Sequence, residues 1–166
     1  MDTVDVLVVG AGLAGLHTAR LLAAQGFDVL VVDRRRSLSV GIRTTGIFVR
    51  RTLDDFDLPD HVLGPGVRDV LLYPPSRRSP VRLTSDRDEY RVADMAAVYA
   101  HARYRAEAAG ARIRLGVRFV STDRGVATFE GADPVTARFV VGADGARSRV
   151  ARSLGLDVNR RLLVGA

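Results

Sequence analysis

Cysteine and lysine are both missing from this 166-residue chain, and aromatic residues make up only 6% of it. The lack of cysteine excludes a disulfide framework, a thiol nucleophile and a cysteine-bound metal. All 25 basic residues are therefore arginine, and the net charge is +6. The arginines are scattered, and the aromatic residues are too few to form a stacking platform for bases. We therefore expect no nucleic-acid partner.

Long apolar runs are missing as well, since none approaches the roughly 20 residues that a membrane-spanning helix needs. The apolar N-terminal segment carries Asp2 and Asp5 and has no basic region before it, which favours a buried strand over a signal peptide. The three histidines share no ligand spacing, so no metal site is expected. With 47% hydrophobic and 27% charged residues, the composition is typical of a globular domain, and we expect a cytoplasmic protein.

The most informative segment runs from Val4 to Arg35. An apolar strand, Val6–Val9, enters the glycine turn Gly10–Gly15; a helix follows and ends at Gly26, and a second strand finishes on Asp33. This is GxGxxG in the strand–turn–helix–strand context that the motif requires, with an acid 18 residues after its last glycine. The segment predicts dinucleotide binding.

Each residue type in the glycine turn has a physical role. Gly10 permits the tight turn, Gly12 lets a pyrophosphate approach bare backbone, and Gly15 lets the helix pack close to the strand. The first-turn amides, which include those of Leu13 and Ala14, have no intrahelical acceptors and point at the phosphates. The turn is therefore predicted to be the pyrophosphate site.

Asp33 narrows the choice of dinucleotide. Its carboxylate is expected to accept hydrogen bonds from a ribose diol and to repel the 2′-phosphate of NADP, which leaves FAD or NAD. Arg34, Arg35 and Arg36 follow at once, so charge alone leaves an NADP-type arginine open. We expect Arg35 and Arg36 in a solvated loop, and Arg34 either there or over the adenine face, where a guanidinium stacks well.

A second motif lies at residues 139–150. An apolar strand again enters a glycine turn, which carries Asp144 and Gly145 and is followed by Ser148 and Arg149. Alone, Asp-Gly is a common turn pair. More than 100 residues after a strong GxGxxG it is a more specific signal.

With these motifs the chain resembles the FAD-dependent oxidoreductases that include p-hydroxybenzoate hydroxylase-type monooxygenases, flavin-dependent halogenases and geranylgeranyl reductases. The resemblance implies that the glycine turn receives the FAD pyrophosphate and that Asp33 binds the adenosine ribose. It also implies that Arg43 reaches the pyrophosphate side, and that Asp144 and Gly145 lie near the pyrophosphate and ribityl chain. FAD is the expected cofactor, with NAD(P)H as a transient electron donor.

The activity that the resemblance implies is an NAD(P)H- and O₂-using monooxygenase that hydroxylates a small organic molecule. A flavin-dependent prenyl reductase or a halogenase is the alternative within enzymes, and a non-catalytic dinucleotide-binding fragment is the alternative of another class. Two features depart from the family. Met95 stands where many members carry an arginine near the cofactor, and a late Gly-Asp pair has no counterpart before Ala166. We therefore expect either the N-terminal portion of a longer enzyme or a truncated gene product, with an apolar, strand-like segment over 162–166.

The middle of the chain predicts mixed elements. Residues 46–56 have helix-like apolar spacing, 67–73 alternate as a strand, and 81–83 can pair back as a hairpin. Further along, the pattern predicts a helix over 93–109 and strands over 112–115, 117–122, 126–130 and 135–141. We expect an α/β, FAD/NAD(P)-binding Rossmann-like three-layer fold with a β-meander crossover. Residues 1–166 form the FAD-binding domain in this interpretation, and the resemblance implies that 67–84 contribute to a substrate-domain sheet.

Overall fold

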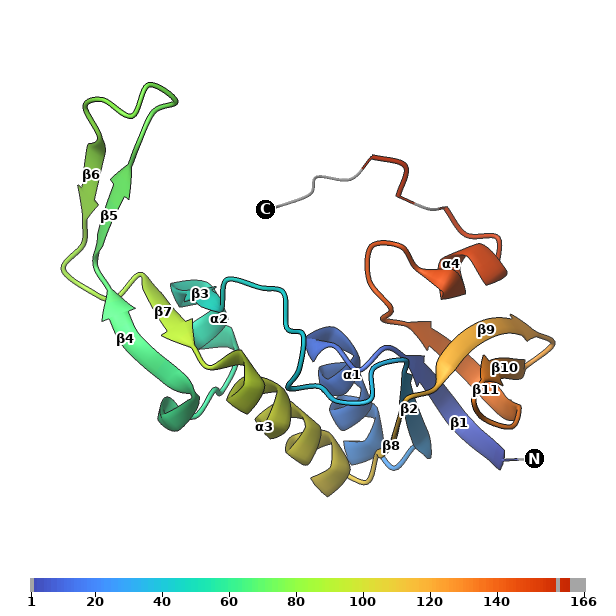
Figure 1. The fold of residues 1–166 in the computed structure, drawn as a ribbon. Helices are drawn as coiled ribbons and strands as arrows, with labels where there is room; N and C mark the ends of the chain where they lie inside the picture. The colour runs from blue at the N-terminus through green and yellow to red at the C-terminus, as the bar shows by residue number, and fades with distance from the viewer. Residues whose placement is uncertain (1, 158, 162–166) are drawn as a thin grey trace. The chain divides into compact units, whose positions relative to one another are not determined.

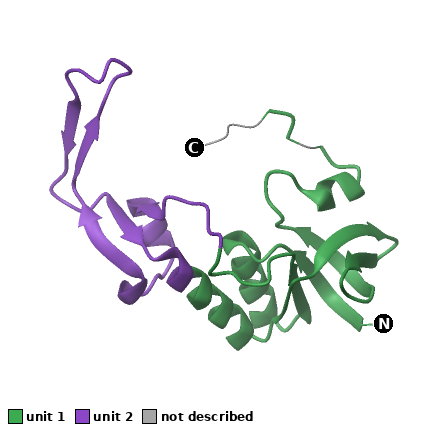
Figure 2. Cartoon of the chain, in the orientation of Figure 1, with its two compact units in different colours: residues 1–40, 99–166 green, residues 41–98 purple. Residues whose placement is uncertain are grey.

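The computed structural model describes residues 2–157 and 159–161 (Figure 1). The chain divides into two compact units (Figure 2). Residues 1–40 and 99–166 form the first, here called the discontinuous unit, and residues 41–98 form the inserted unit. The predicted strand-like segment over 162–166 lies outside the described residues.

The discontinuous unit is built on a six-stranded sheet with the strand order β8-β2-β1-β11-β10-β9. Its strands are β1 (Asp2–Val9), β2 (Val29–Asp33), β8 (Arg112–Leu115), β9 (Arg118–Asp123), β10 (Val126–Glu130) and β11 (Val135–Gly142). The pairs β2–β8, β1–β2 and β1–β11 are parallel, whereas β9, β10 and β11 pair antiparallel. The predicted Rossmann-like α/β fold is confirmed, and the antiparallel strands are its meander.

Both faces of the central strands are covered, which explains why β1 and β2 are almost continuously apolar. Val6 and Val8 face a cluster that includes Leu16 and Ala19 of α1 (Leu13–Ala24) and Ala106 of α3 (Met95–Ala108). On the opposite face of the sheet a second core cluster includes Leu7, Val9, Leu30, Val32, Phe119, Ala127, Val135 and Val150. Val150 belongs to the short helix α4 (Arg149–Ser153). The period-2 alternation of the strands thus divides the core between two clusters.

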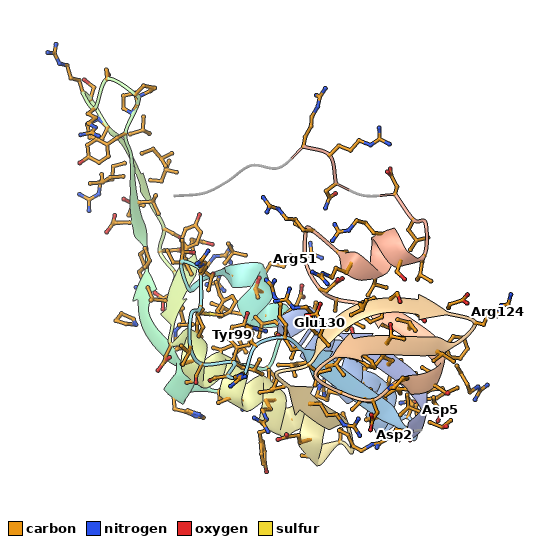
Figure 3. The ribbon with its side chains drawn as sticks, turned by 45° about the vertical axis from the view of Figure 1, so that its right-hand side comes forward. Asp2, Asp5, Arg51, Tyr99, Arg124 and Glu130 are labelled. Carbon is orange, nitrogen blue, oxygen red and sulfur yellow. The ribbon has the colours of Figure 1, made fainter. Side chains whose placement is uncertain are left out.

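Charged side chains pair at the N-terminal end of β1, where Figure 3 shows Asp2 and Asp5. Arg112 contacts Asp2 at 3.1 Å and Asp28 at 3.0 Å, and Arg138 contacts Asp5 at 3.1 Å. Such exposed pairs each contribute little to stability. They do, however, neutralise arginines at the end of β1 opposite to the glycine turn.

The inserted unit contains a three-stranded antiparallel sheet in the order β3-β7-β4. Its elements are β3 (Ile47–Val49), α2 (Arg50–Asp55), the 3₁₀ turn η1 (Asp60–Val62), β4 (Leu63–Val67), β5 (Asp69–Leu72), β6 (Val81–Thr84) and β7 (Tyr90–Ala93). The helix predicted over 46–56 is wrong in its first half, because Ile47–Val49 pair with β7 instead. The strand predicted over 67–73 is divided at Arg68, since β4 ends at Val67 and β5 begins at Asp69.

The predicted hairpin is present as β5 and β6, which pair antiparallel. Register matches Val70 with Leu83 and Leu72 with Val81, and these four side chains share one face because opposed residues point the same way. The other face carries the ion pair of Arg82 with Asp69, at 3.0 Å. The hairpin therefore has one apolar face, and Leu72, Val81 and Leu83 are each more than half exposed.

Among residues 2–157 and 159–161, no helix is long and apolar enough to cross a membrane. The same residues contain no group of three or more histidine or carboxylate side chains placed to hold a metal ion.

Candidate dinucleotide-binding cleft

The glycine turn lies at the carboxyl end of β1, between the ends of its two parallel neighbours. The Gly10 amide donates to the Val32 carbonyl at 2.8 Å, and the Ala143 amide donates to the Val9 carbonyl at 2.8 Å. Gly10 has a φ of +110°, and a Cβ there would collide with the carbonyl group of Ala143. Only glycine fits this position, because both the backbone angle and the close approach of the second glycine turn require it.

Gly15 and Gly12 are glycines for different reasons. A Cβ on Gly15 would collide with the Gly10 carbonyl oxygen and lie 3.2 Å from the Ala143 Cβ, so helix α1 packs directly on the turn. Gly12 has φ −74° and ψ 175°, which any residue adopts, and nothing lies within 4 Å of a Cβ placed there. The packing of the chain therefore does not require glycine at position 12. A ligand that approaches the bare backbone at this position would require it.

Gly12 is also the N-cap of α1, and no side chain caps the helix. The first α-helical hydrogen bond runs from the Leu16 amide to the Gly12 carbonyl at 2.9 Å. The amides of Leu13, Ala14 and Gly15 precede that bond and so have no intrahelical acceptor. A helix terminus of this kind attracts an anion such as a pyrophosphate.

Asp33 is buried at the end of β2, with 9% of its surface exposed. One carboxylate oxygen, Oδ2, accepts the Ala11 amide at 2.8 Å and Arg35 Nη2 at 3.0 Å. The other, Oδ1, accepts the Arg35 amide at 2.8 Å and Arg35 Nε at 3.2 Å. Burial by itself would raise the pKa of Asp33, but these hydrogen bonds from Arg35 and Ala11 outweigh it and hold the pKa below its ordinary value. The acid is therefore ionised and ties β2 to the glycine turn.

The solvated position predicted for Arg35 is wrong. Its side chain is only 32% exposed, is paired with Asp33, and lies over the ring of Tyr99 at 5.5 Å. The hydrogen bonds to Asp33 raise the pKa of Arg35 still further. Arg34 and Arg36 are exposed. A position of Arg34 over an adenine ring stays a prediction.

The Asp144 carboxylate holds the second glycine turn against α4. It accepts Ser148 Oγ and the Arg149 amide, each at 2.6 Å, and the Val150 amide at 3.3 Å. Ser148 in turn accepts the Ala151 amide at 2.9 Å as the N-cap of α4. Sequence reasoning missed this capping role, although the serine four residues after the acid was its signal.

Both motifs open into one cleft of about 480 Å³ at the carboxyl ends of β1, β2 and β11. Six of the predicted site residues line it: Gly10, Gly12, Asp33, Arg34, Asp144 and Gly145. Four further arginines also line it: Arg35, Arg118, Arg147 and Arg149. The remaining predicted residues are placed elsewhere, with Leu13, Ala14 and Gly15 in the first turn of α1 and Arg43 exposed in the inserted unit. The arrangement suits an elongated, polyanionic ligand.

Comparison with known proteins assigns the family. The sequence profile described as FAD binding domain matches residues 3–162, and the chain belongs to that family. The 3-(3-hydroxy-phenyl)propionate/3-hydroxycinnamic acid hydroxylase of Mycolicibacterium gilvum is 33% identical over 93% of this chain and 30% of its own length. This match confirms the resemblance to FAD-dependent oxidoreductases that the sequence motifs indicated.

Two solved structures resemble the chain closely. A geranylgeranyl bacteriochlorophyll reductase-like protein from Thermoplasma acidophilum matches with a TM-score of 0.82 and 26% identity, over 95% of this chain and 43% of that one. Aklavinone-11 hydroxylase in complex with FAD and aklavinone matches with a TM-score of 0.70 and 31% identity, over 92% and 35%. The chain thus spans less than half the length of each relative named here.

Proposed function

We propose that this chain supplies the FAD-binding part of a flavin-dependent monooxygenase that uses NAD(P)H and O₂ to hydroxylate a small organic molecule. The observation that carries the proposal is the open space in front of Gly12, in a cleft that both glycine motifs line. The hydroxylases among its relatives support the reaction class. A cytoplasmic location and the lack of a nucleic-acid partner stay predictions.

In this proposal different residues of the cleft contact different parts of FAD. Gly12 and the first-turn amides of α1 receive the pyrophosphate, and Asp33 faces the adenosine ribose. The turn of Asp144 and Gly145 borders the pyrophosphate from the opposite strand, and Arg43 is proposed as a further contact. Bound FAD supplies the redox chemistry, whereas these residues bind and orient it.

The hairpin β5–β6 is proposed to belong to the substrate-domain sheet. Its exposed apolar face, Val70, Leu72, Val81 and Leu83, suits a sheet that contacts an organic substrate or covers its pocket. A prenyl reductase is the second candidate, favoured by the TM-score of 0.82 to the geranylgeranyl bacteriochlorophyll reductase-like structure.

Titration with three ligands tests the binding assignment. The 166-residue chain should bind FAD and ADP, and should bind FMN at least tenfold more weakly, because FMN lacks the adenosine and the pyrophosphate. Equal affinity for FMN and FAD would contradict the assignment. In the enzyme that contains this chain, hydroxylation with O₂ consumption supports the monooxygenase, whereas oxygen-independent reduction of a prenyl double bond supports the second candidate.

A further inference from the structure

The Asp33 carboxylate has its hydrogen-bonding capacity filled by the chain itself. A carboxylate offers about four acceptor positions, two on each oxygen. Asp33 accepts four hydrogen bonds, at 2.8, 3.0, 2.8 and 3.2 Å. A ribose diol donates two. The ribose can therefore bind Asp33 only if some of these donors leave.

The donors differ in how easily they can leave. The Ala11 amide lies in the glycine turn and the Arg35 amide lies in the main chain beside β2, so neither moves without the backbone. Nε and Nη2 belong to the Arg35 side chain, which lines the cleft and is 32% exposed. These two donors hold one site on each carboxylate oxygen. That is the pair of sites that a diol needs.

The Arg35 side chain has other contacts that do not involve Asp33. Nη2 also donates to the Ala11 carbonyl at 3.0 Å, and the guanidinium lies 5.5 Å from the centre of the Tyr99 ring. A side chain with such alternatives stays anchored at the cleft when it releases the carboxylate.

We propose that the Arg35 guanidinium occupies the ribose-binding positions of the Asp33 carboxylate in the FAD-free protein and is displaced from them when the adenosine ribose binds. The inference rests on the proposed function, which places the ribose at Asp33. In this proposal the interaction between Arg35 and Asp33 stabilises the FAD-free fold but opposes FAD binding. A purely structural contact would favour both.

Arg36 provides a matched control. It is a neighbouring residue and is exposed, it is not among the residues that line the cleft, and none of the four hydrogen bonds to Asp33 comes from it. Arg36→Met and Arg35→Met each remove one positive charge from the segment that follows β2. The loss of long-range attraction for the pyrophosphate is therefore controlled for, and only Arg35→Met frees the carboxylate while keeping an apolar stem against Tyr99.

The experiment measures urea unfolding without FAD and FAD affinity by flavin fluorescence in the parent and both variants. We expect Arg35→Met to have a lower unfolding midpoint than Arg36→Met and to bind FAD about fivefold more tightly than Arg36→Met does, as the strength of a partly exposed ion pair allows. Arg35→Lys, which keeps the charge but not the two-donor fork, should bind FAD more tightly than the parent.

Three results would overturn the inference or its basis. If Arg35→Met lowers both stability and FAD affinity relative to Arg36→Met, Arg35 is a structural contact only. Equal FAD affinity in the two methionine variants would show that the guanidinium does not compete with the ribose. A parent that binds FMN as well as FAD would instead overturn the proposed function, and this inference with it.

Discussion

Gly12 and Gly15 allow a direct test of where the pyrophosphate lies, because an added methyl group meets opposite surroundings at the two positions. At Gly12 the backbone angles suit alanine and nothing lies within 4 Å of the added carbon. At Gly15 the added carbon runs into the Gly10 carbonyl and lies 3.2 Å from the Ala143 Cβ. The two substitutions should therefore separate binding from folding.

The expected magnitudes follow from these surroundings. Gly12→Ala should raise the free energy of unfolding by about 0.4–1 kcal/mol, because alanine restricts the unfolded chain. It should lower the same free energy by a similar amount, because alanine is a poorer N-cap than glycine. Its stability should stay within about 0.5 kcal/mol of the parent. Gly15→Ala gains about 1 kcal/mol of helix propensity, but overpacking against backbone atoms that cannot rotate away costs about 1–3 kcal/mol or more. It should be the less stable of the two.

The assay combines urea unfolding, followed by circular dichroism, with FAD titration. Gly12→Ala should unfold like the parent yet bind FAD about tenfold more weakly or worse, a loss of about 1.4 kcal/mol, because its methyl group occupies the approach to the backbone. If Gly12→Ala binds FAD as the parent does, the pyrophosphate does not pass over Gly12 and the reasoning is refuted.

Three further predictions concern the two acids of the cleft. Asp33→Ala should weaken FAD binding by about 1–3 kcal/mol, measured by titration, because the ribose loses a charged acceptor; unchanged affinity would remove Asp33 from the site. Because the pKa of Asp33 is lowered in the folded state, the unfolded state binds the proton more readily, so its contribution to stability is present above about pH 4 and is lost as the pH falls through the folded-state pKa. Urea midpoints of the parent should therefore fall more steeply than those of Asp33→Asn between pH 5 and pH 3, and parallel curves would contradict this. Asp144→Ala should lower the free energy of unfolding by about 0.5–2 kcal/mol through lost capping of α4, whereas Asp133→Ala, an exposed control outside the cleft, should not.

The elements that could be predicted from sequence are those whose signals are local. The strand, glycine turn, helix and second strand over residues 4–33 each follow from the period of apolar residues and from glycine placement. The same holds for α3, for β8 to β11, and for the β5–β6 hairpin. These patterns also placed Gly10, Gly12, Asp33 and the Asp144–Gly145 turn at the ends of strands. Parallel strands bring such ends together.

The errors lie where pairing partners are distant in the sequence. Ile47–Val49 form a strand because they pair with β7, which lies more than 40 residues later in the sequence. The sequence around residues 47–49 does not indicate this pairing. The division between Val67 and Asp69 has the same origin, since β4 pairs with β7 while β5 pairs with β6. Tertiary pairing decides β structure more than intrinsic preference does.

By itself, the sequence determined the βαβ architecture, the order of its motifs and the kind of ligand that they suit, because periodicity, glycine and a terminal acid act over short stretches. Only the tertiary structure decided what each side chain does there. It joined Asp33 to Arg35 and the Ala11 amide, made Asp144 an acceptor for the first amides of α4 and for its N-cap Ser148, and left Gly12 facing open space. Hydrogen-bond partners and free volume depend on the positions of atoms that the fold brings together, so the period of apolar residues and the placement of glycine do not by themselves fix them.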